Sequence, residues 1–174
     1  MKTFRTTFPD ELLVCTAPDF LEDVFTWIRP VLRPAHRAGF ETGRIFLILD
    51  EVLSNVYRHG YGHAAGQPIG VRLRVEGDRC DIIIRDLAPH FDGAWHAQRS
   101  ALPAPESAAP GGRGLVIMHR IAESIVHRVP PEGGNELHMV MRMLRRPGVA
   151  TAAPAAVSET APSTEEDDGV VENR

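Results

Sequence analysis

Two runs of alternating apolar and polar residues constrain the fold of this chain most strongly. The segments IGVRLRVEG, residues 69–77, and RCDIIIRD, residues 79–86, place apolar side chains at nearly every second position, which is the period of a β-strand. Gly77 and Asp78 lie at their junction, and both residue types favour tight hairpin turns. The pair therefore predicts an antiparallel hairpin.

Four further strands are predicted from short apolar runs between turn residues. Pro9 and Asp10 separate the first two, and the sequence PPEGG connects the last two. The four predicted strands span residues 3–8, 11–16, 124–129 and 135–144.

The first of three predicted helices follows Asp19, a residue type that can cap a helix N-terminus. It ends at Gly39. Pro30 and Pro34 lie inside it and are expected to kink or break it. Its apolar residues keep helical spacing: Phe20, Val24, Trp27, Ile28, Val31, Leu32 and Ala35.

The second predicted helix runs from about Thr42 to Gly60, where glycine suits a left-handed C-terminal cap. A third helix begins at Arg113, after a glycine-rich stretch. Antiparallel strands combined with helices on one face form a two-layer α/β sandwich. The sequence therefore predicts an α+β fold with a mostly antiparallel, mixed sheet covered on one face by helices.

One folded domain is predicted over residues 1–146, with a tail over residues 147–174. The tail is rich in Ala, Pro and Ser and carries six acidic residues against one basic residue, so we expect it to be disordered. Its acidic cluster is either solvated or binds a partner. The rest of the chain is nearly neutral, which removes the electrostatic basis for nucleic-acid binding.

Residues 87–112 follow neither the helical nor the strand period. A loop of this length within a compact domain is usually a functional lid or a disordered segment. The sequence lacks an apolar run of about 18 residues and begins with acidic residues where a signal peptide needs apolar ones, so a cytoplasmic protein without a membrane segment is expected. Cys15 and Cys80 match no metal or redox spacing and are expected to be reduced and buried.

The second predicted helix carries Glu51, Asn55 and His59 at intervals of four, so these side chains form a polar column along one face. Such a column is either solvated or meets a ligand that interacts with a carboxylate, an amide and an imidazole. The other face is predicted to pack in the core through Ile45, Leu49, Val52, Leu53 and Val56.

Two further sites contribute polar or glycine-rich groups: Asp86 at a strand end, and the sequence GGRG at a helix start. Alone, an Asp there is usually a turn former and a glycine cluster is usually a loop. Together with Asn55 they fit a nucleotide. Glycine-rich amides at a helix start hold phosphates, an Asn oxygen can coordinate magnesium, and an Asp carboxylate can accept a purine amino hydrogen.

The segments EVLSNVYRH, DLAPHFD and GGRGL resemble the three ATP-binding boxes of the GHKL superfamily of ATPases and kinases, and the resemblance covers about residues 10–145. More narrowly, NVYRHGYG and GGRGLVIM are similar to the anti-sigma-factor serine kinases. These are small single-domain relatives that phosphorylate a serine of an anti-sigma-factor antagonist. The resemblance implies a Bergerat-type ATP-binding fold.

The resemblance also implies roles for individual residues. Asn55 is implied to bind magnesium, Asp86 to contact the adenine amino group, and Glu51 to act as the general base. Arg113 either reaches the γ-phosphate or is solvated. The remaining residues implied to bind ATP are His59 and Gly60 on the phosphate side, Ala88, Phe91, Gly111, Gly112, Gly114 and Leu115.

The chain departs from the family pattern at two positions. Ala88 replaces a usual glycine two residues after the Asp, and its methyl group is expected to crowd the purine. Val116 stands where many histidine kinases keep a glycine, and residues before 40 leave no room for their dimerisation helix, so a histidine kinase is disfavoured. No metal-ligand spacing is found among the other histidines, which are expected on the surface or in loops: His63, His90, His96, His119, His127 and His138.

The resemblance implies a Mg-ATP-dependent protein serine/threonine kinase that phosphorylates a STAS-type antagonist and sequesters a sigma factor, as a homodimer. The alternative is a degenerate binding module that sequesters its partner without phosphotransfer. A third possibility is that the polar column is merely solvated.

Overall fold

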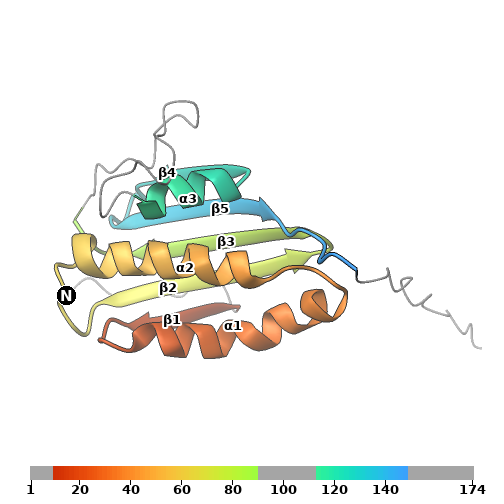
Figure 1. Ribbon diagram of the computed structural model, residues 1–174. Coiled ribbons are helices and arrows are strands. Elements are labelled where there is room, and N and C mark those ends of the chain that lie inside the picture. The colour runs from red at the N-terminus through yellow and green to blue at the C-terminus, as the bar shows by residue number, and fades with distance from the viewer. Residues whose placement is uncertain (1–9, 90–112, 149–174) are drawn as a thin grey trace, which may run out of the picture.

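The structure is a computed structural model that describes residues 10–89 and 113–148. Five described strands form one sheet in the order β1-β2-β3-β5-β4, and each pairing among them is antiparallel (Figure 1). The predicted hairpin is confirmed. The strands are β1 (Glu11–Cys15), β2 (Pro68–Glu76), β3 (Arg79–Asp86), β4 (Ser124–Arg128) and β5 (Asn135–Arg142).

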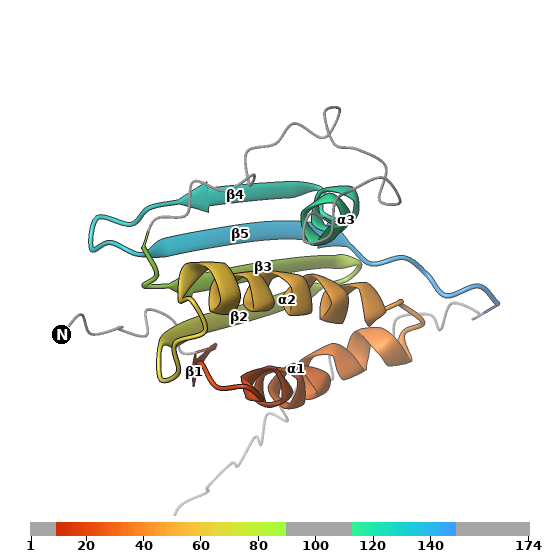
Figure 2. The ribbon, with the colours of Figure 1, turned by 60° about the vertical axis from the view of Figure 1, so that its left-hand side comes forward.

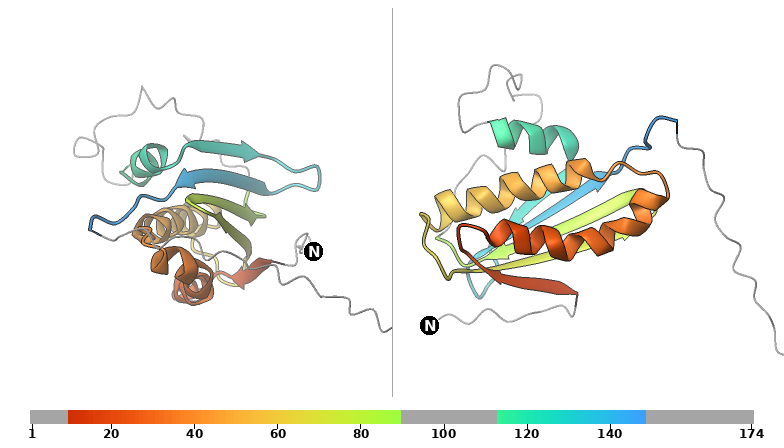
Figure 3. Two further views of the ribbon diagram at one scale, coloured as in Figure 1. Left: turned by 90° about the vertical axis from the view of Figure 1, so that its right-hand side faces the viewer. Right: turned by 60° about the horizontal axis from the view of Figure 1, so that its bottom comes forward.

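Helices α1 (Phe20–Arg37), α2 (Gly43–Asn55) and α3 (Arg113–Ile121) lie on one face of the sheet (Figures 2 and 3). A π-helical turn, η1 (Val56–Gly60), extends α2. The predicted α+β fold with two layers is therefore confirmed. The strand predicted at residues 3–8, most of the lid-like loop and nearly all of the tail lie outside the described residues.

Of the two predicted effects of Pro30 and Pro34, a kink or a break, the break was wrong, because helix α1 continues through both residues. The kink stays a prediction. An interior proline costs a helix about 3 kcal/mol. Here Val24, Ile28 and Leu32 are nearly fully buried along one stripe of the helix, and each buried side chain of this size contributes about 1.5–3 kcal/mol. Packing against the sheet therefore outweighs the local cost.

The two ends of α1 differ in how their backbone groups are satisfied. Asp19 occupies the N-cap position, but its side chain makes no capping hydrogen bond. At the other end, the helix stops two residues before Gly39, the predicted end, and Gly39 has a left-handed φ of 88°. Arg145 donates a hydrogen bond of 2.7 Å to the Ala38 carbonyl, and Arg146 donates one of 2.8 Å to the His36 carbonyl. Distant arginines thus satisfy the terminal carbonyls of this helix.

The left-handed cap predicted at Gly60 was also wrong. The helix passes into the π-turn η1, and the left-handed conformation falls on Gly62 and His63, with φ of 57° and 64°. Gly60 is required for a different reason, because a Cβ atom there would lie 2.9 Å from the Cβ atom of Ala88. Glycine allows η1 to approach the end of β3 closely.

The apolar core lies between the helices and the sheet. Cys80 belongs to it, and burial raises the pKa of its thiol to about 12. Cys15 is exposed, which corrects the expectation that both thiols are buried. It is the last residue of the edge strand β1 and shares its strand face with the exposed Leu13. Within the described residues, no helix is long and apolar enough to cross a membrane.

Candidate functional site

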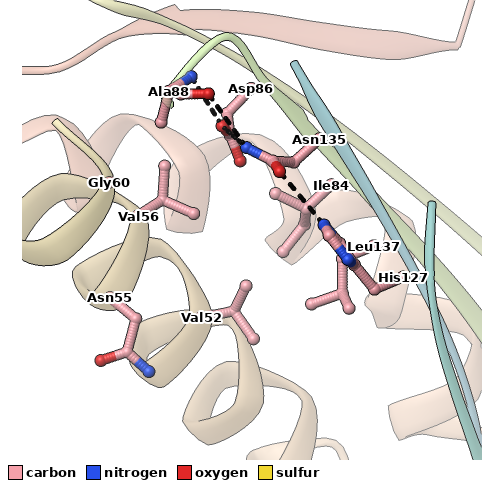
Figure 4. Close-up of a pocket in the computed structure, with 10 residues that line it drawn as sticks. All are labelled: Val52, Asn55, Val56, Gly60, Ile84, Asp86, Ala88, His127, Asn135 and Leu137. Carbon is pink, nitrogen blue, oxygen red and sulfur yellow. Dashed lines mark hydrogen bonds between the residues drawn. The ribbon is translucent and has the colours of Figure 1, made fainter. Parts of the chain in front are cut away.

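A pocket opens between the end of α2 and the adjoining ends of the central strands (Figure 4). It contains about 440 Å³ of space, including its opening to solvent. Its walls combine apolar side chains from both layers with a polar end. The lining residues are Val52, Asn55, Val56, Gly60, Ile84, Asp86, Ala88, His127, Asn135 and Leu137.

The apolar walls come from opposite layers of the domain. Val52 and Val56 project from the helical layer, and Ile84 and Leu137 project from the sheet (Figure 4). Alternation along β3 and β5 places these sheet residues on the helix-facing side. Apolar walls of this kind are typical of sites that bind a flat, largely apolar ring.

Asp86 forms the polar end of the pocket. It is the last residue of β3 and is only 6% exposed. Its Oδ1 atom accepts hydrogen bonds from the Ala88 backbone amide at 2.9 Å and from Asn135 Nδ2 at 2.7 Å. Oδ2 takes part in neither bond. The pocket therefore offers a carboxylate oxygen as an acceptor at the end of an apolar slot.

Burial raises the pKa of Asp86 above its ordinary value. The hydrogen bonds from Asn135 and Ala88 and the charge of His127 act in the opposite direction, because they favour the ionised form. Burial is the larger effect. Asp86 is consequently a carboxylate held in an environment that disfavours its charge.

Ala88 and Gly60 form a matched pair across the pocket. Ala88 is buried, and its methyl group lies where any side chain on Gly60 would collide with it. The extra methyl group at the usual glycine position is therefore accommodated by the missing side chain on η1.

Tyr61 fixes the backbone at this end of the sheet. Its hydroxyl donates a hydrogen bond of 2.7 Å to the Pro68 carbonyl and accepts one of 2.7 Å from the Leu87 amide. Burial, helped by the charge of Asp86, raises the pKa of Tyr61 to about 12. The hydroxyl thus joins the start of β2 to the residue after Asp86.

We expect Tyr61→Phe to destabilise the fold by about 1–3 kcal/mol, because a partly buried amide and a partly buried carbonyl lose their partner. Urea denaturation measures this loss. Tyr57→Phe is the matched control, since within the described part of the chain the Tyr57 hydroxyl makes no hydrogen bond. Equal stability of the two variants would contradict the role given to Tyr61.

Glu51 does not line this pocket but lies between α2 and α3. A Cβ atom on Gly114 would overlap Glu51 Oε2 and would lie 2.7 Å from its Cδ atom. Gly114 is buried in the first turn of α3. Glycine is therefore needed at the start of α3 so that the Glu51 carboxylate can occupy this space.

Comparison with known proteins assigns this chain to a family. The profile of the histidine kinase-like ATPase domain matches residues 16–141. The chain belongs to this family. One similar solved structure is the mycobacterial sensor histidine kinase MprB, with a TM-score of 0.40 and 15% identity, covering 78% of this chain and 99% of that chain. Curated proteins give no match.

This family membership confirms the GHKL superfamily that the motifs predicted, and it implies an ATP-binding domain. The pocket brings together four of the predicted ATP-binding residues: Asn55, Gly60, Asp86 and Ala88.

The polar column on the second helix is divided by the fold. Asn55 lines the pocket, Glu51 faces Gly114, and His59 lies exposed on η1 outside the pocket. The π-turn widens the helix after Asn55, so a residue four positions later no longer stacks on the same face.

Several predicted catalytic and ATP-binding residues remain predictions. The Glu51, His59 and Gly114 assignments rest on the resemblance alone. Five further groups lie outside what the structure describes: Phe91, Gly111, Gly112 and the side chains of Arg113 and Leu115.

The histidines correct one expectation. His119 is buried on α3 and His127 lines the pocket from β4, so neither is a surface or loop residue. His63 is exposed, and His138 of β5 pairs with Asp81 of β3. His90 and His96 lie outside the described residues. Over residues 10–89 and 113–148, no cluster of three His, Cys, Asp or Glu side chains could hold a metal.

Asn135 and His127 were missed as site residues. Both have a signal in the sequence, because each is a polar residue at a core-facing position of its strand. Asn135 lies on the same face of β5 as the buried residues Leu137 and Met139. His127 lies on the same face of β4 as Ile125, which packs against the core. A polar side chain on an apolar face needs a partner.

Proposed function

We propose that this domain is a Mg-ATP-dependent serine/threonine protein kinase of the anti-sigma-factor type. The observation that carries the nucleotide part is the Asp86 carboxylate, which lines a largely apolar pocket and whose Oδ2 atom takes part in neither of the two hydrogen bonds accepted by Oδ1. The serine/threonine kinase part is supported by the similarity of NVYRHGYG and GGRGLVIM to those kinases.

The residues of the pocket fit an adenine base. Val52 and Val56 on one side and Ile84 and Leu137 on the other provide apolar surfaces for a planar ring. Asp86 Oδ2 provides the acceptor that an exocyclic amino group needs.

Asn55 is the residue that we assign to magnesium. Its amide oxygen is a hard ligand, and magnesium normally takes one or two protein ligands and completes its shell with water and phosphate oxygens. A single Asn is therefore a sufficient protein contribution.

We expect Asn55→Ala to remove most of the dependence of ATP affinity on magnesium while leaving magnesium-free binding close to that of the wild type. Calorimetric titration with and without magnesium measures both affinities. An unchanged magnesium effect in a folded Asn55→Ala variant would exclude Asn55 as the ligand.

Glu51 is the proposed general base. When bound, Mg-ATP supplies the transferable phosphoryl group. The contribution of Glu51 is to accept the proton of the acceptor hydroxyl on a carboxylate oxygen and to orient that hydroxyl. Its place between α2 and α3, outside the base-binding slot, is compatible with a role in chemistry rather than in base recognition.

We propose a STAS-type anti-sigma-factor antagonist as the substrate and a sigma factor as the sequestered partner, with the kinase acting as a cytoplasmic homodimer. No direct contact with nucleic acid or membrane is proposed. The test is to incubate the domain with a candidate antagonist and Mg-ATP and to measure the intact mass of the antagonist. Gain of one phosphate, absent without magnesium, is the expected result.

The second candidate function is a binding module that does not transfer phosphate, and Ala88 at the usual glycine position favours it. The same measurement separates the two functions. An antagonist that binds the domain tightly but gains no phosphate would contradict the kinase and support the binding module.

A further inference from the structure

Asp86 is the first member of a line of three polar side chains that crosses neighbouring strands. In the strand register, Asp86 of β3 lies directly opposite Asn135 of β5. His127 of β4 pairs in register with Leu137 of β5, and its Nε2 atom lies 3.1 Å from Asn135 Oδ1. Figure 4 shows the three side chains in sequence along one wall of the pocket.

The hydrogen-bond geometry determines how the Asn135 amide is oriented. Its Nδ2 atom lies 2.7 Å from Asp86 Oδ1 and 3.3 Å from the Ala88 carbonyl oxygen. Both neighbours are acceptors, so a flipped amide would place three oxygens together. Nδ2 therefore donates to both, and Oδ1 faces His127.

The same argument determines the proton on His127. Because Asn135 Oδ1 can only accept a hydrogen bond, Nε2 of His127 must carry the hydrogen. The line thus runs in one direction, with His127 donating to Asn135 and Asn135 donating to Asp86. Asn135 is 7% exposed, so a wrongly oriented amide would leave a buried group unsatisfied.

We propose that His127 and Asn135 are positioning residues that hold Asp86 as a pure acceptor and thereby make the pocket select 6-amino purines over 6-oxo purines. This inference rests on the proposed nucleotide-binding function. Oδ1 is occupied by Asn135 and Ala88, so the carboxylate presents Oδ2 to the base. A 6-amino group donates to that oxygen, whereas a 6-oxo group brings a second acceptor against it.

Removal of the Asn135 donor would weaken this selection in two ways. The carboxylate would keep only the Ala88 amide and could rotate about its broad terminal torsion. Asn135 and His127 also both lower the pKa of Asp86 against the effect of burial. Without them the carboxyl group protonates more easily, and a protonated carboxyl can donate to a 6-oxo group.

The test compares ATP and GTP affinities by calorimetric titration of the full chain. The wild type should prefer ATP. Asn135→Val replaces the amide with an apolar side chain that suits a strand. This variant should lower the ratio of ATP to GTP affinity about tenfold. His127→Phe removes the Nε2 hydrogen bond to Asn135 and also the charge that lowers the pKa of Asp86, so it should lower the ratio in the same direction.

Two further variants separate positioning from structural damage. His127→Gln keeps a side-chain donor and should restore most of the selectivity. His138→Phe is the matched control and should leave the ratio unchanged. His138 lies opposite Val126, the residue before His127, but its side chain pairs with Asp81 at 3.2 Å. If Asn135→Val fails to fold, the two His127 variants still decide the question.

The outcomes distinguish this inference from the function on which it rests. A wild type that prefers ATP, with folded variants that keep the same ratio, would overturn the positioning role and leave the nucleotide site intact. A folded wild type that binds neither nucleotide would overturn both. If His138→Phe decreased the ratio of ATP to GTP affinity as much as His127→Phe does, the effect would be general damage, and this outcome would also overturn the inference.

Discussion

Asp86→Asn should abolish ATP binding while making the unliganded domain more stable at neutral pH. The amide keeps an oxygen for the Ala88 and Asn135 donors but presents a donor to the adenine amino group. Loss of a charged hydrogen bond, together with two opposed donors, lowers affinity at least about 100-fold. Calorimetric titration and urea denaturation measure the two effects.

The stability gain follows from the raised pKa of Asp86. A carboxyl group with a folded-state pKa above its unfolded value contributes its full stability at low pH and loses it as the pH rises through the folded-state value. The neutral amide avoids that loss. The advantage of Asp86→Asn should therefore be present at pH 7 and disappear on acidification toward the ordinary pKa of 3.8.

A variant that is less stable than the wild type at pH 7 would contradict this explanation. Asp81→Asn is a useful comparison. A hydrogen bond from Arg79 holds the pKa of Asp81 below the ordinary value, so removal of the Asp81 charge should not stabilise the protein. Replacing these two aspartates of β3 with asparagine is thus expected to change the stability of the protein in opposite directions.

Glu51→Gln should reduce phosphotransfer by about 10²–10⁴-fold, the usual contribution of a general base, while changing ATP affinity by less than about threefold. The amide has nearly the same shape, so contact with Gly114 is retained. Glu51 also does not line the base-binding pocket. Single-turnover transfer kinetics and calorimetric titration measure the two quantities.

Asp50→Asn is the matched control, because it removes a neighbouring carboxylate on the same helix. Full phosphotransfer by a folded Glu51→Gln variant would remove Glu51 from the mechanism. A parallel loss of ATP affinity would instead assign Glu51 to nucleotide binding.

The fold was largely predictable because its signals are local. Alternation identified the β2–β3 hairpin, and helical spacing identified α1 and α2. The errors occurred where tertiary packing overrides local preference. Pro30 and Pro34 stay within α1 because its apolar stripe is buried, and the π-turn at η1 moves the left-handed conformation past Gly60.

The site was only partly predictable because its geometry depends on contacts between distant segments. Asn55 and Asp86 were identified from motif order, and both line the pocket. The positions of Asn135 and His127 depend on β5 lying between β3 and β4, which the order of strands along the chain does not reveal. The contact between Glu51 and Gly114 depends in the same way on how α3 packs against α2.

Calorimetric titration of the wild-type chain with ATP, with and without magnesium, tests the central claim most directly. The pocket geometry predicts saturable binding to one site, strengthened by magnesium and lost in Asp86→Asn. The absence of binding by the folded wild type would contradict the assignment of this pocket to a nucleotide, and binding that survives in Asp86→Asn would place the nucleotide elsewhere.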